Sequence, residues 1–470
     1  EKLWKQEEQA QKTSLTQTVI KLADEIYRKG RQEQNAPQML KAYICRETYQ
    51  EGLTPDSLYS SLKYMESWAL SERNLVNKAI LHSLLAYEYA DLMRKNRRVL
   101  LSRTLLTVDE VPEDIREWSI SQFVDKIDRC NRASLQESIR LLNTSAEQYV
   151  PFVVLEDGSW FYGHDMYHLL VSRAVDAYRQ LDGFSVDSLV QIRIDRIYLD
   201  MMNAYRHRAG SEDAMVLSSL DYWNWKLTGG ISQQPYPTFR MRQEKANREY
   251  LEVLNKLIKE YGSREVCAEV YIHKANHLRR LEPKRADEAL KVCEEGLKRY
   301  PAYKRINELK NIREQILQPE LILTMNESGY PGDSVNMRLH YRNVEGFTLN
   351  LYTTTLSEVP WMDHGINKDT YRKYARKFSS THFGLKPLPG KDKLPEDVPY
   401  LASDTVFKFM IPRETGVYIL QIVPDTETAR TDDKFLVSTR FKVLTLDLGD
   451  NRMEVATLDA RSGQPIAGAK

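Results

Sequence analysis

The hydrophobic period of the chain changes near Gln318 and Pro319, and this change constrains the fold more than any other feature. Before it, apolar residues recur at helical spacing; in residues 74–96 one face holds Leu75, Ile80, Leu84, Leu85, Tyr89 and Leu92. After it, apolar and polar residues alternate, as a strand requires; one such series is Val335, Met337, Leu339 and Tyr341. The sequence therefore predicts a multidomain protein, all-α in its first part and all-β in its second.

Further helices are expected around residues 114–130, 134–143, 186–208, 240–261 and 264–280. Helix starts are predicted at Asn35-Ala36-Pro37 and Thr54-Pro55-Asp56, because each combines a capping residue with an early proline. Gly30 and Gly52 are expected to end the preceding helices. Residues 153–160 are expected to form a short hairpin or loop.

The end of the helical part resembles a tetratricopeptide unit. Small, aromatic and proline residues fall near the positions of that repeat: Tyr271, Ala275, Ala289, Cys293, Gly296 and Pro301. Small residues let two antiparallel helices approach closely, and Pro301 would end the second helix. The alternative is a helical domain without repeats, because earlier helix pairs do not share the pattern.

The second part predicts an antiparallel β-sandwich of roughly 100 residues. Its expected strands are separated by turn residues at Pro331-Gly332-Asp333, Arg342-Asn343 and Glu414-Thr415-Gly416. A charged insertion is expected at about 358–404, with a short surface helix at 369–377. The expected domains are a helical domain at 1–317, the sandwich at 318–445, and the start of a second sandwich at 446–470.

Residues 455–470 predict a strand, then a turn at Arg461-Ser462-Gly463, and then a segment that leads into another strand. A two-stranded ribbon is marginal in water, so these residues are expected to meet a further sheet in a longer protein.

The charge of the chain and its cysteines argue against several kinds of binding site. The sequence has 67 Lys and Arg against 66 Asp and Glu, a net charge of +1, which argues against a nucleic-acid or anionic-membrane surface. No apolar run approaches the roughly 20 residues of a transmembrane helix. The four cysteines are scattered, which favours buried thiols over zinc or disulfides: Cys45, Cys130, Cys267 and Cys293.

The order of the β motifs is similar to that of a known family. Tyr330-Pro331-Gly332-Asp333 leads into Leu349-Asn350-Leu351-Tyr352, and Ile411-Pro412 is followed by Gly416-Val417-Tyr418. This order resembles the first macroglobulin-type sandwich of bacterial alpha-2-macroglobulin-like proteins, and Asp459-Ala460-Arg461-Ser462-Gly463 resembles the start of the next one. The long helical forepart resembles the Bacteroidetes-type members.

This resemblance implies a protease trap, in which a protease cleaves a bait segment and the macroglobulin domains rearrange around it. In many members an internal thioester, formed within a Cys-x-Glu-Gln arrangement, captures the protease; none of the four cysteines here lies in such a motif. The chain is therefore expected to be a scaffold portion without enzyme activity or cofactor, with proteins as partners. The resemblance also implies a cell-envelope or periplasmic location, with a possible lipid anchor upstream of residue 1.

The run Gly163-His164-Asp165-Met166-Tyr167-His168 is a candidate metal site. His164 and His168 are four residues apart, so on a helix they share a face, as in H-E-x-x-H metalloproteases. Asp165 would replace the catalytic glutamate with a shorter side chain, and a third ligand would come from Asp176, Asp187 or Asp195. Alternatively, His164 and Asp165 cap the helix while Tyr167 and the following leucines pack inward.

Two aromatic clusters, Trp160-Phe161-Tyr162 and Tyr222-Trp223-Asn224-Trp225, could form a binding platform or pack between helices. Three hypotheses for function remain at this stage: the protease-trap scaffold, an interaction scaffold unrelated to protease inhibition, and a metal-dependent hydrolase that uses His164 and His168.

Overall fold

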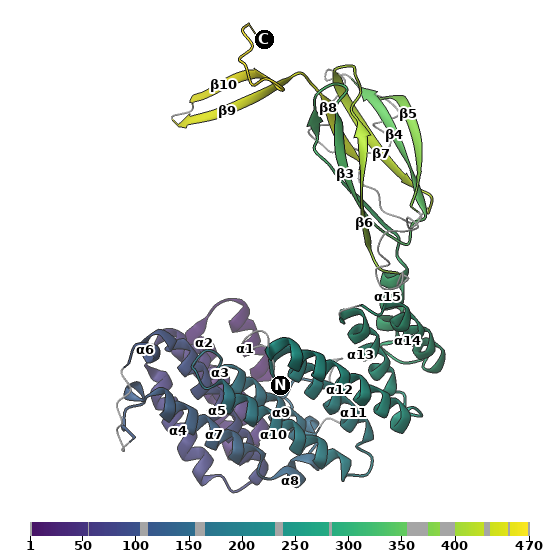
Figure 1. The fold of residues 1–470 in the computed structure, drawn as a ribbon. Helices are drawn as coiled ribbons and strands as arrows, with labels where there is room; N and C mark the ends of the chain where they lie inside the picture. Colours follow the sequence, from purple (N-terminus) through teal and green to yellow (C-terminus); the bar gives the residue numbers. More distant parts are fainter. Residues whose placement is uncertain are drawn as a thin grey trace. The chain divides into compact units, whose positions relative to one another are not determined.

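The computed structural model describes residues 2–54, 56–103, 111–155, 165–230, 238–281, 284–354, 375–385, 400–426, 433–449 and 452–468. The chain divides into two compact units, Glu1–Val270 and Tyr271–Lys470. The first unit is helical, and the second begins with helices and continues as strands (Figure 1). The predicted order, helices followed by a β-sandwich, is confirmed. Within the described residues, no helix is both long enough and apolar enough to cross a membrane.

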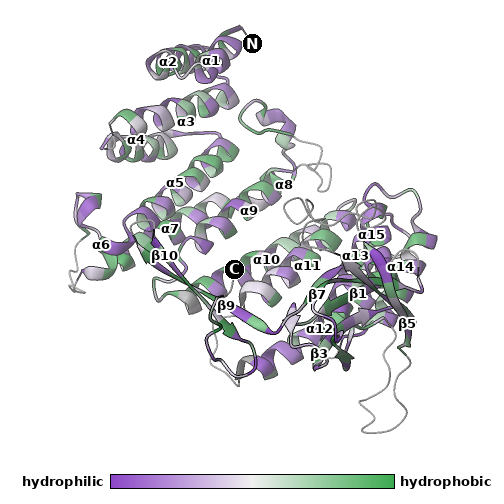
Figure 2. Cartoon of the chain, turned by 90° about the horizontal axis from the view of Figure 1, so that it is seen from above, coloured by the Kyte–Doolittle hydropathy of each residue, from purple (hydrophilic) through white to green (hydrophobic). Residues whose placement is uncertain are grey.

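The helices of the first unit carry both hydrophobic and hydrophilic residues (Figure 2). Their bounds are α1 Lys2–Lys12, α2 Thr16–Gln32, α3 Ala36–Leu53, α4 Ser57–Ser71, α5 Leu75–Lys95, α6 Arg97–Ser102, α7 Ile120–Leu135, α8 Ser138–Leu142, α9 Met166–Arg179, α10 Asp187–Arg206, α11 Glu212–Trp225 and α12 Thr238–Tyr261. Some, such as α2 and α7, collect the apolar residues on one face, whereas α5 and α11 are buried on most sides. Short turns lie at Ile115–Glu117 and Ala146–Tyr149, and a π-helical turn at Lys226–Gly230 follows α11.

The predicted helix starts are largely correct, and α2 and α3 end within two residues of Gly30 and Gly52, but neither glycine forms the C-cap. Asn35 caps α3 by accepting a hydrogen bond from the Gln38 amide at 3.2 Å. Gly30 and Gly52 both lie inside helices and have no positive φ. Gly30 instead permits close packing, because a Cβ there would lie 3.1 Å from the Met39 side chain.

Another predicted helix begins and ends elsewhere. The helix expected from residue 114 begins at Ile120, because Ser119 and Gln122 form a capping box at that point. It continues to Leu135, past the expected end at 130. Of the loop expected at 153–160, residues 156–160 lie outside the described part, and residues 153–155 have no regular structure.

The second unit begins with a closely packed group of helices, in which α14 Ala286–Arg299 packs against α15 Ile306–Leu317. Helix α13 spans Cys267–Arg280, so the division at Val270 falls within it. A Cβ added at Gly296 of α14 would lie 3.1 Å from the Tyr271 Cβ and 2.7 Å from the Leu309 Cδ1. The small residue therefore sets the approach of α14 to both of its neighbours. Whether earlier helix pairs repeat this unit stays a prediction.

All four cysteines are free thiols. Cys130, Cys267 and Cys293 are buried and Cys45 is half-buried, so the interpretation as packed thiols is confirmed for three of them.

The sandwich consists of two sheets in the strand orders β1-β3-β6 and β2-β8-β7-β4-β5. Every pairing within them is antiparallel except the short one between β2 and β8, which is parallel. The strand bounds are β1 Glu320–Thr324, β2 Ser328–Gly329, β3 Ser334–Arg342, β4 Gly346–Thr354, β5 Arg376–Gly384, β6 Ser403–Met410, β7 Gly416–Pro424 and β8 Lys434–Ser438.

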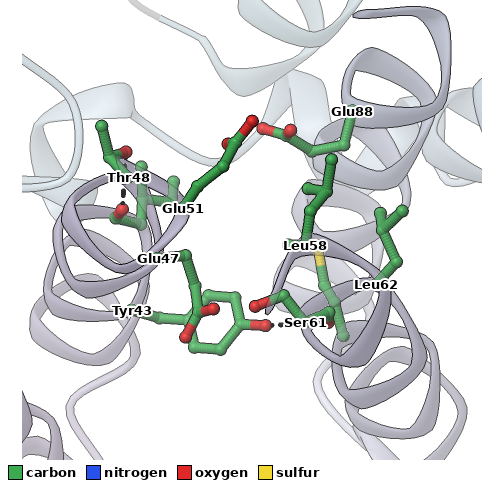
Figure 3. Close-up of a pocket in the computed structure, with 10 residues that line it drawn as sticks. Tyr43, Glu47, Thr48, Glu51, Leu58, Ser61, Leu62 and Glu88 are labelled. Atoms are coloured by element: carbon green, nitrogen blue, oxygen red, sulfur yellow. Dashed lines mark hydrogen bonds between the residues drawn. The ribbon is translucent and has the colours of Figure 1, made fainter. Parts of the chain in front are cut away.

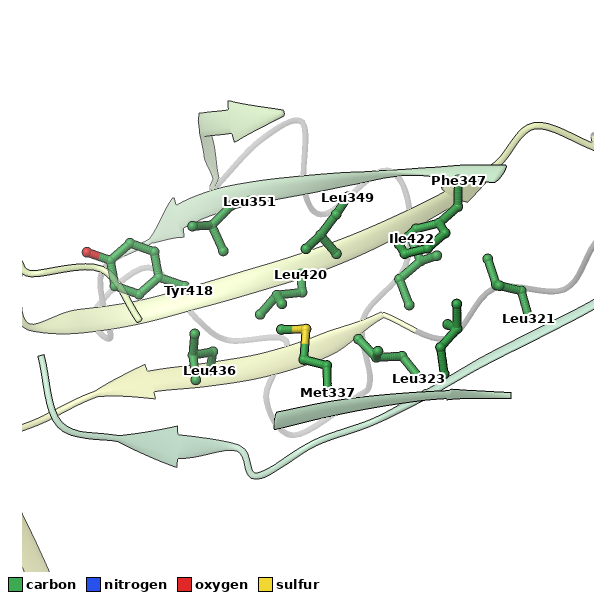
Figure 4. Packing of buried hydrophobic residues seen from close by; sticks show 11 residues of the cluster. Leu321, Leu323, Met337, Phe347, Leu349, Leu351, Tyr418, Leu420, Ile422 and Leu436 are labelled. Atoms are coloured by element: carbon green, nitrogen blue, oxygen red, sulfur yellow. The ribbon is translucent and has the colours of Figure 1, made fainter. Parts of the chain in front are cut away.

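Apolar side chains from both sheets meet in one core (Figure 4). Met337 and Leu339 from β3 face Leu349 and Leu420 from β4 and β7, and all four are almost fully buried. The predicted alternation on these strands is therefore confirmed.

The expected surface helix at 369–377 is wrong at its end, because Arg376 and Lys377 belong to β5. This strand lies at the edge of the sheet and pairs with β4, and most of its side chains are exposed. An edge strand buries little surface, so β5 can carry mostly polar residues, and no apolar alternation predicts it from the sequence. Of the insertion expected at about 358–404, residues 358–374 and 386–399 lie outside the described part, and strand β6 already begins at Ser403.

Two further strands, β9 Phe441–Gly449 and β10 Arg452–Asp459, pair only with each other among the described strands. Helix α15 ends at Leu317, the last residue expected in the helical domain, and β1 begins at Glu320. The boundary expected at 445 falls within β9.

We predict opposite effects of alanine at two helical glycines. Gly296→Ala should lower the free energy of unfolding by about 1–3 kcal/mol, because the added methyl group overpacks the contact with Tyr271 and Leu309. Gly52→Ala should raise it by about 0.5–1 kcal/mol, because open space surrounds a Cβ at that position. Differential scanning calorimetry of the two variants measures both effects, and a neutral Gly296→Ala would contradict the packing analysis.

Candidate interaction surfaces

The metal site expected at His164 and His168 lies only partly within the described residues. His164 is outside them, so the structure does not test whether the two histidines share a site. His168 lies in the first turn of α9, and burial lowers the pKa of its imidazole to about 4. Among the described residues no group of three His, Cys, Asp or Glu side chains could hold a metal ion.

Of the three aspartates expected as third ligands, two have other partners. Asp195 accepts a hydrogen bond from the Tyr222 hydroxyl at 2.7 Å, and Asp176 lies 3.6 Å from Arg179 in an exposed ion pair. The side chain of Asp187 lies outside the described part.

Asp165 has a structural role at the start of α9. Its carboxylate accepts the backbone N–H of His168 at 2.9 Å, which caps the helix. It also accepts the hydroxyl of Tyr205 from α10 at 3.0 Å. Both side chains are buried, and burial raises the pKa of the carboxyl. The network joins α9 to α10, as the capping interpretation requires.

The second aromatic cluster is part of the helical core. Tyr222, Trp223 and Trp225 are each less than a tenth exposed, and the Trp223 ring stacks on Tyr250 with centroids 5.5 Å apart. Packing, not a binding platform, explains this cluster. Trp160-Phe161-Tyr162 lies outside the described residues.

A small pocket of about 50 Å³ that no sequence motif predicts lies between α3, α4 and α5 (Figure 3). Its walls include Leu58 and Leu62, and the carboxylates of Glu51 and Glu88 face each other across it. Burial, together with the charges of Asp91 and Glu51, raises the pKa of Glu88. Glu51 is paired with Lys95 at 2.7 Å, which offsets part of this negative charge.

The ribbon of β9 and β10 exposes apolar side chains on both of its faces. The pairing places Phe441, Val443, Met453 and Val455 on one face, and alternation places Leu444, Leu446 and Leu448 on the other. Each of these side chains is about half exposed or more. Two-stranded ribbons have little stability of their own in water, so this surface is suited to contact with another protein surface.

The turn predicted at Arg461-Ser462-Gly463 follows β10 and is confirmed. The Asp459 carboxylate accepts the Ser462 amide at 2.8 Å, and Gly463 adopts a positive φ of 71°. The chain then returns along β10, where the Ile466 amide donates to the Thr457 carbonyl at 2.9 Å.

No family model matches the chain, and no curated protein sequence matches it. Among solved structures, part of the chain is similar to native alpha-2-macroglobulin from Escherichia coli, in a structure spanning domains MG0-NIE-MG1. The identity is 15%, the TM-score is 0.24, and the match covers 32% of this chain and 48% of the other. A second match is Spo0M, the sporulation control protein from Bacillus subtilis, at 10% identity and a TM-score of 0.17, over 31% of this chain and 69% of that one. With TM-scores this low, neither match defines the fold of this chain.

We predict that Asp165→Ala destabilises the helical unit by about 2–4 kcal/mol, because it removes the cap of α9 and leaves the buried Tyr205 hydroxyl without its acceptor. Asp165→Asn keeps an acceptor oxygen for both donors, so it should lose less stability. Urea unfolding followed by circular dichroism at helical wavelengths measures both variants. Equal losses would contradict the capping role.

We also predict that His168 makes the helical unit sensitive to acid. The fold favours the neutral imidazole, with a pKa of about 4 against an ordinary 6.5. The stabilisation is therefore complete above about pH 6.5 and is lost as the pH falls through 4. Thermal unfolding of wild type and His168→Leu across this range should show a steeper decline in wild type; parallel curves would contradict the assignment.

Proposed function

We propose that this chain is a non-catalytic scaffold portion of an alpha-2-macroglobulin-like protein that traps proteases in the cell envelope. The observation that carries the proposal is the ribbon β9–β10, with apolar side chains exposed on both faces. Burying one Val or Leu side chain stabilises a protein by about 1.5–3 kcal/mol, so covering this surface would yield a substantial gain. A following macroglobulin-type sandwich in a longer polypeptide would supply that cover.

The turn and strand positions in the sandwich support the proposal. Gly332 has a φ of 81° in the turn that opens β3, and Gly416-Val417-Tyr418 opens β7. These are the places at which macroglobulin-type domains carry the corresponding motifs. Buried side chains hold the two sheets together, so the sandwich would act as a rigid unit of the frame around a trapped protease.

The helical unit would serve as a docking module for a protein partner. Helices packed side by side present a broad surface with room for specific pockets. No cofactor, nucleic acid or enzymatic step belongs to this proposal. Export to the envelope, with a lipid anchor upstream of residue 1, follows from the family resemblance alone.

Two other functions lead to different expectations. An interaction scaffold unrelated to protease inhibition would use the same surfaces but would not enclose a protease. A metal-dependent hydrolase would need His164, His168 and a third ligand around one ion, and zinc titration of the metal-free protein by calorimetry tests for it. Absence of heat above background would eliminate that alternative.

The trap is tested with the full-length gene product and an endopeptidase such as trypsin. Enclosure blocks large substrates but admits small ones, so we expect trypsin to lose activity on a protein substrate and to keep it on a dipeptide amide. Val455→Ser should weaken this protection, because it removes an apolar contact of the ribbon. Val406→Ser is the matched control, since Val406 is also exposed on a strand, at 55% against 57%. If trypsin incubated with the protein stayed equally active on both substrates, the trap would be rejected. The interaction scaffold unrelated to protease inhibition would then remain.

A further inference from the structure

A larger pocket lies within the helical unit, between α7, α9 and α10. Its volume is about 640 Å³, within the usual range of ligand-binding pockets. These three helices are neighbours (Figure 1). Arginine side chains line the pocket from two of them: Arg129 and Arg132 from α7, and Arg193 and Arg196 from α10.

A buried carboxylate fixes two of these arginines. Asp128 is 6% exposed and accepts the Tyr178 hydroxyl at 2.7 Å. The same carboxylate lies 2.7 Å from Arg193 Nε and 3.2 Å from Arg132 Nε. Because each guanidinium has five N–H donors, both arginines keep donors for another acceptor after pairing with Asp128. Asp128 therefore orients the two arginines and leaves some of their N–H donors available for another acceptor.

One further polar side chain on the pocket wall, that of Asn131, lacks a hydrogen-bond partner among the described residues. The Asn131 side chain is 1% exposed, and neither its nitrogen nor its oxygen has a partner in hydrogen-bonding geometry. It does lie near the Tyr178 hydroxyl, where it opposes the rise in pKa that burial and Asp128 cause. Tyr167 also lines the pocket, and burial together with Asp200 raises the pKa of its hydroxyl to about 12, so this group stays protonated and can donate. A buried amide without a partner is costly, which favours a ligand or water at this place.

We propose that this pocket binds a carboxylate side chain of an acidic peptide segment in a partner protein. The proposal deepens the docking role of the helical unit and rests on it for the class of partner. The guanidinium groups, the Asn131 amide and the tyrosine hydroxyl can all donate hydrogen bonds to oxygen, and a carboxylate accepts such bonds. Leu135, Ile197 and the tyrosine rings add apolar wall for the aliphatic stem of a glutamate.

The charge balance favours a carboxylate over a phosphate. Four arginines meet three aspartates here, since Arg129 pairs with Asp125 at 2.6 Å and Arg196 with Asp200 at 3.0 Å, in addition to Asp128. The surplus is a single positive charge, which one carboxylate neutralises. A phosphate group with nearly two negative charges would exceed it.

The test uses the 470-residue chain and two fluorescent capped peptides, Leu-Ala-Glu-Ala-Leu and the same sequence with Gln in place of Glu. We expect the Glu peptide to bind at least about tenfold more tightly in fluorescence anisotropy. Its binding should also weaken with added salt, because exposed arginines contribute. Inorganic phosphate is the competing probe and should displace the peptide poorly.

Arg196→Gln should weaken binding of the Glu peptide about threefold to tenfold. The matched control is Arg240→Gln on α12, because Arg240 also pairs with an acidic residue four positions on and is similarly exposed, at 70% against 74%. The control should bind as wild type does. The proposal would be overturned if the two peptides bound equally or if the two variants had equal effects. It would also be overturned if phosphate displaced the labelled peptide at a lower concentration than the unlabelled Glu peptide does. Because no protease is involved, failure here is distinct from failure of the trap.

Discussion

The need to bury apolar side chains away from water determines how the elements pack in each part of this chain. In the sandwich two sheets cover one another, and Met337, Leu420 and their neighbours become almost inaccessible to water. In the helical unit α2 and α7 turn one apolar face toward their neighbours, and α5 and α11 are buried on most sides. The ribbon β9–β10 has a single pair of strands, so neither of its faces is covered in this way. Its exposed side chains therefore mark it as a contact surface.

Polar groups inside the helical unit follow a second constraint, because a buried charge is tolerated only with partners. Asp165 meets this demand with a backbone amide and Tyr205, and Asp128 meets it with Tyr178 and two arginines. In both cases a tyrosine from another helix supplies the neutral donor. The first network is closed and joins two helices, whereas the second leaves guanidinium donors facing a pocket, and that difference separates a structural site from a candidate binding site.

Expectations from sequence succeeded where one element's own pattern decided the outcome, and failed where a neighbour decided it. The alternation in β3 and β4 and the cap at Asn35 are local, and both were predicted correctly. Gly30 was expected to stop a helix, yet Met39 of the next helix explains why a small residue is needed there. Strand β5 was missed because an edge strand needs no continuous apolar face.

The sequence by itself determined the change from helix to strand, because hydrophobic period is a property of neighbouring residues along the chain. It also determined the turns at Gly332 and Gly463, since positive φ favours glycine. Only the tertiary structure brought Arg193 of α10 to Asp128 of α7, 65 residues away in sequence, where Arg132 pairs with the same carboxylate from one turn further along α7. It also left the Asn131 side chain beside them without a hydrogen-bond partner among the described residues. No local pattern encodes that site, because it arises from the packing of three helices whose contacts are fixed only when the whole unit folds.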